Sequence, residues 1–269
     1  MFICAICFLI GGCSLNIPLE DQFSDPDAIT DVLSARSLLA SAYKAMPQQI
    51  FQLSVLSDDF CPSQHLNKDM SLQGLYNWRE VEMTELAGTL WAGYYAVIAE
   101  VNALLARIDA VVTLDETEKL EKMRIVCEAK ALKSWCYFDL LRLFAPRYEG
   151  NENKDGIILK KRVELDFLPR SSVKECVTEI RTLLNEARNV DNTQKNVYWL
   201  SDKAVAYLQV ELELYAGNYP AVLELTKDLE TEYPESVLGA DVYKYLWSSE
   251  NTVSEIAEIL GVSRQAVNN

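Results

Sequence analysis

The chain has 269 residues, enough for one large domain or two small ones. Hydrophobic residues make up 49% of it and charged residues 24%, an ordinary globular composition that argues against long disorder. Asp and Glu number 40 against 25 Lys and Arg, a formal net charge of −15. A chain this acidic repels phosphate backbones, so we expect no nucleic-acid partner.

An apolar, uncharged run opens the chain. Residues 1–12 read MFICAICFLIGG, which is the length of a signal-peptide core and too short to span a bilayer. Ile10-Gly11-Gly12-Cys13 has the form of a lipobox, in which small residues fit a signal-peptidase cleft and the cysteine thiol takes the lipid. We therefore predict a lipoprotein signal peptide at 1–12 and a lipidated tether at 13–33. A buried N-terminal strand is the alternative.

No metal site or cofactor is predicted. The single histidine, His65, argues against a His-rich zinc site. The cysteines beyond the lipobox show no metal-ligand spacing and are interpreted as small apolar fillers: Cys61, Cys127, Cys136 and Cys176. The acidic residues Asp25, Asp27 and Asp31 are interpreted as helix caps rather than calcium ligands. There is no phosphate-binding loop and no dinucleotide fingerprint.

Apolar residues recur every three or four positions along most of the chain, which predicts an all-α fold. Helices are predicted over 34–46, 90–108, 116–144, 172–187, 202–216 and from about 220 to just before 234. The segment 47–88 has little regular period and is predicted to be a long irregular loop region with room for short helices. Such stretches inside a compact domain are often functional.

The last two predicted helices resemble a tetratricopeptide unit. Gly217, Tyr219 and Pro234 stand at the spacings where that repeat ends its first helix, fills the turn and ends its second helix. Helix pairs of this kind cannot bury their apolar faces alone and must stack on neighbours. The chain is thus expected to form tetratricopeptide-like helical pairs.

Several segments, in their order and spacing, resemble the SusD/RagB family of outer-membrane nutrient-binding lipoproteins from Bacteroidetes. They are Cys13 with its tether, Leu56–Asp59, the pattern W-x-x-x-Y-x-x-I-x-x-x-N over Trp91–Asn102, Glu128–Leu132 followed by Tyr137–Phe144, Pro169–Val173 and Ala204–Tyr219. Ala145 departs from the family pattern, which has glycine after the phenylalanine.

This resemblance implies a lipid-anchored protein on the outer-membrane surface that is not an enzyme. It captures a glycan or another nutrient and delivers it to a TonB-dependent transporter. Residues 34–247 would form the N-terminal part of the family's helical domain, and 248–269 an uncertain tail. Because family chains are usually much longer, an incomplete copy is expected, helical but prone to aggregate.

The ligand site is predicted in the irregular segment. Trp78 offers a flat apolar face for a sugar ring, and Asn77, Arg79 and Asp59 are the expected polar partners. In the alternative interpretation, Trp78 is a core residue that holds the loop against Trp91 and Tyr94.

Three other functions are weighed against glycan capture. A tetratricopeptide-like protein-interaction scaffold gains support if Trp78 is buried. A carboxylate-based glycosidase would use Asp58 and Asp59, or Glu80, Glu82 and Glu85. Residues 252–269 match a DNA-binding helix-turn-helix, but the acidic composition and the predicted signal peptide argue against DNA binding.

Overall fold

The computed structural model describes residues 29–61, 70–163, 167–188 and 198–232. The chain divides into two compact parts, residues 1–217 and 218–269, which are treated separately. In the first part, the described helices are α1 (Val32–Lys44), α2 (Ile50–Leu56), α3 (Met70–Tyr76), α4 (Glu80–Arg107), the short 3₁₀-helix η2 (Ile108–Ala110), α5 (Glu116–Phe144), α6 (Val173–Ala187) and α7 (Asp202–Tyr215). The second part contains α8 (Tyr219–Glu232). The all-α prediction is confirmed.

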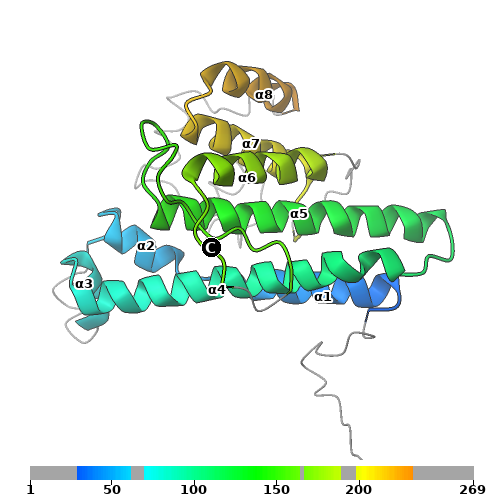
Figure 1. The fold of residues 1–269 in the computed structure, drawn as a ribbon, viewed down its shortest axis with the longest axis horizontal. Helices are drawn as coiled ribbons and strands as arrows, with labels where there is room; N and C mark the ends of the chain where they lie inside the picture. The colour runs from blue at the N-terminus through cyan, green and yellow to red at the C-terminus, as the bar shows by residue number, and fades with distance from the viewer. Residues whose placement is uncertain (1–28, 62–69, 164–166, 189–197, 233–269) are drawn as a thin grey trace, which may run out of the picture. The chain divides into compact units, whose positions relative to one another are not determined.

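Two long helices form the centre of the first part. Helices α4 and α5 have 28 and 29 residues and lie side by side, with α1 against both of them and α6 along α5 (Figure 1). Val97, Ile98 and Val101 from α4 and Ile125 and Leu132 from α5 are fully buried. The fold therefore rests on apolar stripes at helical spacing, as the sequence pattern indicated.

The predicted helix starts are supported by side-chain caps. Ser172 and Glu175 form the predicted capping box at the start of α6. Asp31 caps α1, and Asp115 accepts a hydrogen bond from the backbone N–H of Glu118 at the start of α5. The interpretation of Asp31 as a cap is confirmed, while Asp25 and Asp27 lie outside the described residues.

Regular structure is more extensive in 47–88 than the sequence pattern indicated. Helices α2 and α3 lie within this segment, and α4 begins at Glu80 rather than near Leu90. Both short helices have seven residues, too few to show a clear period. Glu80 and Glu82 in the first turn of α4 suit a helix N-terminus, because carboxylates interact favourably with its dipole.

The link between α5 and α6 contains the predicted short extended piece. Asp155 and Ser172 form an isolated antiparallel bridge. The Tyr95 hydroxyl donates to the carbonyl of Ile158 (2.9 Å) and accepts from its N–H (3.0 Å). The Tyr137 hydroxyl and the Asn102 side-chain amide both donate to the Lys160 carbonyl, at 2.6 and 2.9 Å. Side chains of α4 and α5 thus supply the hydrogen bonds that a neighbouring strand would supply in a sheet.

The cysteine interpretation is confirmed in part. Among the described residues, Cys61, Cys127, Cys136 and Cys176 form no disulfide. Cys136 and Cys176 are buried and Cys127 is half-buried, as expected for apolar fillers. Cys61 is exposed, so the filler interpretation is wrong for that residue.

Among the described residues, Glu80–Ala110 is long and apolar enough to cross a membrane by length and composition alone. Its buried residues are those that pack in the core of the first part, against α1 and α5. A core helix passes the same composition test, so this finding carries no membrane assignment.

The predicted helices on either side of Gly217 are both present. Gly217 follows α7 with a φ of 72°, the left-handed conformation that ends a helix and favours glycine. Helix α8 begins at Tyr219, close to the predicted start. Because these helices belong to separate parts of the chain, their tetratricopeptide-like pairing stays a prediction.

Candidate functional site

Two short helices end in the same uncommon way beside the predicted site. In α3, the N–H of Arg79 donates to the carbonyl of Gly74 (2.8 Å) and the N–H of Trp78 to that of Leu75 (3.0 Å). This is the Schellman motif, whose turn residue takes a left-handed conformation and is usually glycine. Here that residue is Trp78, with a φ of 54°. A bulky side chain in this conformation is a genuine outlier.

Helix α2 repeats the arrangement. The N–H of Asp59 donates to the carbonyl of Ser54 (2.9 Å), the N–H of Asp58 lies 3.4 Å from that of Val55, and Asp58 has a φ of 65°. Left-handed conformations of residues other than glycine cost free energy and persist only where the surrounding structure maintains them. They cluster at functional sites. These turns are therefore the first candidates for a site in this part of the molecule.

Trp78 is 61% exposed. That exposure does not fit a core residue holding the loop against Trp91 and Tyr94. Trp91 instead packs against Tyr95 and Phe144, with ring centroids 4.9 and 5.0 Å away. The exposed face that a sugar platform requires is present, while sugar binding by Trp78 stays a prediction.

The three predicted polar partners are also exposed. The Asn77 amide donates to the carbonyl of Gln73 (2.7 Å), which leaves its side-chain oxygen as an acceptor. The Arg79 guanidinium lies 3.8 Å from the Glu82 carboxylate. Asn77 and Arg79 flank Trp78 in sequence, whereas Asp59 follows α2 and accepts a hydrogen bond from the Ser57 hydroxyl (2.7 Å).

Helices α2, α3 and the start of α4 hold these turns at one end of α4. Helix α2 packs against α3, and α3 against α4 (Figure 1). Gly74 is buried in this contact, and a Cβ atom added to it would lie 2.3 Å from Cδ of Glu82. Glycine at this position therefore leaves room for the Glu82 side chain to pack against α3.

An aromatic pair near the site was missed by sequence reasoning. The rings of Phe51 and Phe60 lie 5.8 Å apart, and the two residues are 50% and 54% exposed. Phenylalanine in an apolar pattern suggests a core position, so hydropathy alone gave no signal. The short apolar helix around Phe51, too short for a full stripe, was the only hint.

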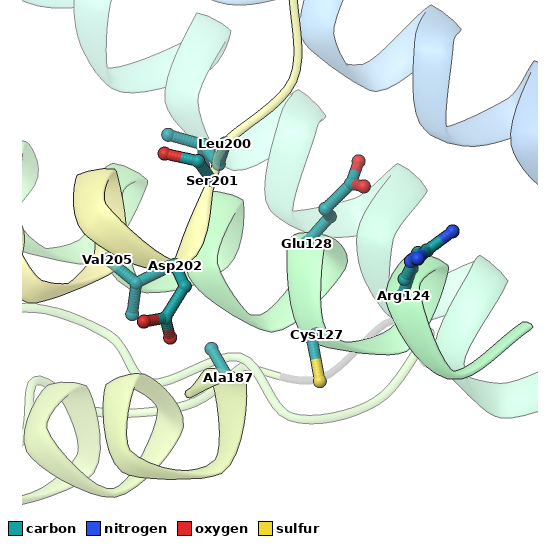
Figure 2. Close-up of a pocket in the computed structure, with 8 residues that line it drawn as sticks. All are labelled: Arg124, Cys127, Glu128, Ala187, Leu200, Ser201, Asp202 and Val205. Atoms are coloured by element: carbon teal, nitrogen blue, oxygen red, sulfur yellow. The ribbon is translucent and has the colours of Figure 1, made fainter. Parts of the chain in front are cut away.

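A cleft between α5, α6 and the start of α7 does not suit a sugar. Figure 2 shows the eight residues that line it, among them Cys127 and Glu128 from α5 and Asp202 from α7. It has room for about one water molecule, far less than a sugar ring needs. None of its residues was predicted as a site residue.

The charged groups around this cleft tie helices together. The Arg36 guanidinium on α1 donates to the carboxylates of Glu128 (2.6 Å) and Glu121 on α5. It also lies over the Trp199 ring, 4.8 Å from its centroid. Burial raises the pKa of Glu128, and the bonds from Arg36 oppose that rise. We interpret this cluster as a structural connection between α1 and α5.

Three sequence-based candidates lie outside the described residues and stay predictions. They are the lipidation site Cys13, the single histidine His65 and the helix-turn-helix match at 252–269. Among the described residues, no group of His, Cys, Asp and Glu is arranged to hold a metal ion.

The comparisons with known proteins identify the class. A family model described as "starch-binding associating with outer membrane", SusD-like, matches residues 19–211. This is well over half of the chain, which therefore belongs to the SusD-like family. A comparison with curated proteins found no match.

Solved structures show the same fold. The chain is similar to a SusD superfamily protein from Bacteroides vulgatus ATCC 8482 (19% identity, TM-score 0.64, covering 81% of this chain and 52% of that one). It is also similar to one from Bacteroides thetaiotaomicron VPI-5482 (17% identity, TM-score 0.63, covering 81% and 50%). A laminarin-binding SusD-like protein matches at 20% identity and TM-score 0.55, covering 75% and 44%. The chain thus spans about half the length of these structures.

Proposed function

We propose that this chain is part of a glycan-binding lipoprotein of the outer membrane, which captures its ligand at the cell surface and delivers it to a TonB-dependent transporter. The observation that carries the proposal is the family match over residues 19–211, whose description joins starch binding with the outer membrane. The chain acts by binding and is not an enzyme.

The α3–α4 turn supports this function locally. Trp78 is exposed, and its strained conformation has no evident benefit for the stability of the fold. An indole face contacts the apolar face of a pyranose, while neighbouring amide, guanidinium and carboxylate groups hydrogen-bond its hydroxyls. Trp78 is therefore the proposed platform, with Asn77, Arg79 and Asp59 as orienting groups.

Affinity electrophoresis tests this site. The protein is run through native gels with and without laminarin or amylopectin, and we expect at least one of them to retard it. Trp78→Ala should abolish the retardation while leaving a folded protein. Tyr207→Ala is a matched control, because Tyr207 on α7 is a similarly exposed aromatic residue away from α2 and α3.

Two results would count against the proposal. If neither polysaccharide retards the wild type, glycan capture by this chain is not supported for these ligands. If Trp78→Ala stays folded and is retarded like the wild type, the site is wrong although the function stands.

The alternative functions have weaker support. The scaffold hypothesis would have gained support from a buried Trp78, and Trp78 is exposed. Of the five carboxylates named for the glycosidase hypothesis, Glu82 packs against Gly74 and lies near Arg79, as expected for a packing residue.

A further inference from the structure

The end of the first part built from α2, α3 and the first turns of α4 combines exposed aromatic rings with negative charge. We call it the α2–α3 end, and define it as residues 50–61 and 70–85. Phe51, Phe60 and Trp78 are each half-exposed or more on it, and the two phenylalanine rings form a pair. Exposed aromatic rings suit a ligand with flat apolar faces.

The charges on this end are mostly negative. Its sequence contains five carboxylates and no lysine: Asp58, Asp59, Glu80, Glu82 and Glu85. Its single guanidinium, Arg79, lies 3.8 Å from Glu82. Asp58, Asp59 and Glu80 are exposed. An arriving ligand therefore meets hydrogen-bond acceptors and a negative potential.

We propose that the α2–α3 end binds uncharged glycans and rejects glycans that carry uronate or sulfate groups. Aromatic faces stack on any pyranose, so they do not distinguish these classes. Carboxylates do, because they accept hydrogen bonds from sugar hydroxyls but repel a second anion. This inference rests on the proposed glycan-binding function and narrows it to a class of ligand.

The test compares neutral and acidic polysaccharides on one protein. Affinity electrophoresis at low ionic strength, with laminarin, amylopectin or polygalacturonate in the gel, gives an apparent Kd for each. We expect polygalacturonate to bind the wild type at least about tenfold more weakly than the better neutral polysaccharide. Added salt should narrow this gap, because screening weakens repulsion between exposed charges.

A matched pair of variants locates the effect. Asp58→Asn with Glu80→Gln removes two charges from the α2–α3 end, and asparagine tolerates the left-handed conformation at position 58. Asp109→Asn with Glu116→Gln removes two exposed charges near the connection from η2 to α5. The first variant should lower the ratio of the apparent Kd for polygalacturonate to that for the neutral polysaccharide at least about threefold. The second variant should leave this ratio unchanged.

Each outcome decides between the claims. If polygalacturonate binds the wild type as well as a neutral glycan, or if both variants behave alike, the charge selection is overturned and glycan binding stands. If no polysaccharide binds, both proposals fail together. If the Asp58→Asn, Glu80→Gln variant does not fold, the salt dependence of the wild type tests the charge selection instead. A difference in apparent Kd between acidic and neutral polysaccharides that added salt does not reduce would overturn it.

Discussion

Replacing Trp78 with glycine and with alanine separates the backbone strain of this residue from its side-chain contacts. Both substitutions remove the indole ring, so the lost packing cancels in their difference. Alanine keeps a Cβ atom, which is unfavourable at the observed φ of 54°, whereas glycine adopts this conformation without a steric penalty. We therefore expect Trp78→Gly to be more stable than Trp78→Ala.

The expected difference is about 1 kcal/mol. A left-handed conformation costs an L-residue roughly 1–2 kcal/mol, and the greater flexibility of glycine in the unfolded chain offsets roughly 0.5–1 kcal/mol of that gain. For a domain of this size, about 1 kcal/mol corresponds to roughly 2–4 °C in melting temperature. Urea denaturation followed by far-ultraviolet circular dichroism measures the difference directly.

Tyr207 supplies the control with the opposite sign. It is a similarly exposed aromatic residue in the middle of α7, where the backbone is right-handed. There glycine should be less stable than alanine by about 1 kcal/mol. If glycine is no more stable than alanine at position 78, or if both positions give the same order, the left-handed strain at Trp78 is refuted.

Three further predictions concern the core and the anchor. Arg36→Ala should cost about 3–5 kcal/mol in urea denaturation at pH 7, because it leaves Glu128 buried without its partner. Acid should recover part of this loss, since burial raises the pKa of Glu128 and a protonated carboxyl needs no counter-charge; a loss that does not depend on pH contradicts this. Burial lowers the pKa of Lys133 to about 8, so the unfolded state binds more protons above that pH and the unfolding free energy should rise from about pH 8 to 10. Lys133→Met should remove this rise, and unfolding free energies of wild type and variant that change in parallel with pH would contradict the prediction. Cys13 should be labelled by a palmitate analogue, and label that persists in Cys13→Ala would exclude it as the lipid site.

The long helices were predictable because their apolar residues repeat over several turns. The span 116–144 matches α5, and the Ser172–Glu175 pattern marked the start of α6. The early start of α4 was not predictable in this way, since its first turns are mostly exposed and carry a weak period. The same reason hid α2 and α3, whose seven residues complete only two turns.

Buried polar contacts could not be predicted from the sequence pattern. Arg36 and Glu128 are 92 positions apart, and only the packing of α1 against α5 brings them together. Lys133 is 5% exposed and donates to Asn102 on α4, although lysine is normally assigned to the surface. These residues read as ordinary helix-surface charges until the neighbouring helix is known.

The candidate site was predictable only as a composition. Exposed Trp78 with Asn77 and Arg79 could be selected because the three adjoin one another in an aperiodic stretch. The left-handed turns at Trp78 and Asp58 could not be predicted, because glycine usually marks such turns and neither residue is glycine. Nor could the exposed Phe51–Phe60 pair, whose residue type indicates a core position.

The core and the proposed binding end lie at different positions along α4. Where α4 meets α1 and α5, its side chains are fully buried and the neighbouring charges are paired across helices. At the α2–α3 end, helices of seven residues, too short to be stable alone, carry both the strained turns and the exposed rings. Local backbone hydrogen bonds form those turns, and tertiary contacts such as that of Glu82 with Gly74 support them. A rigid core that supports short, marginal elements is the arrangement expected when a surface is kept for a ligand rather than for the fold.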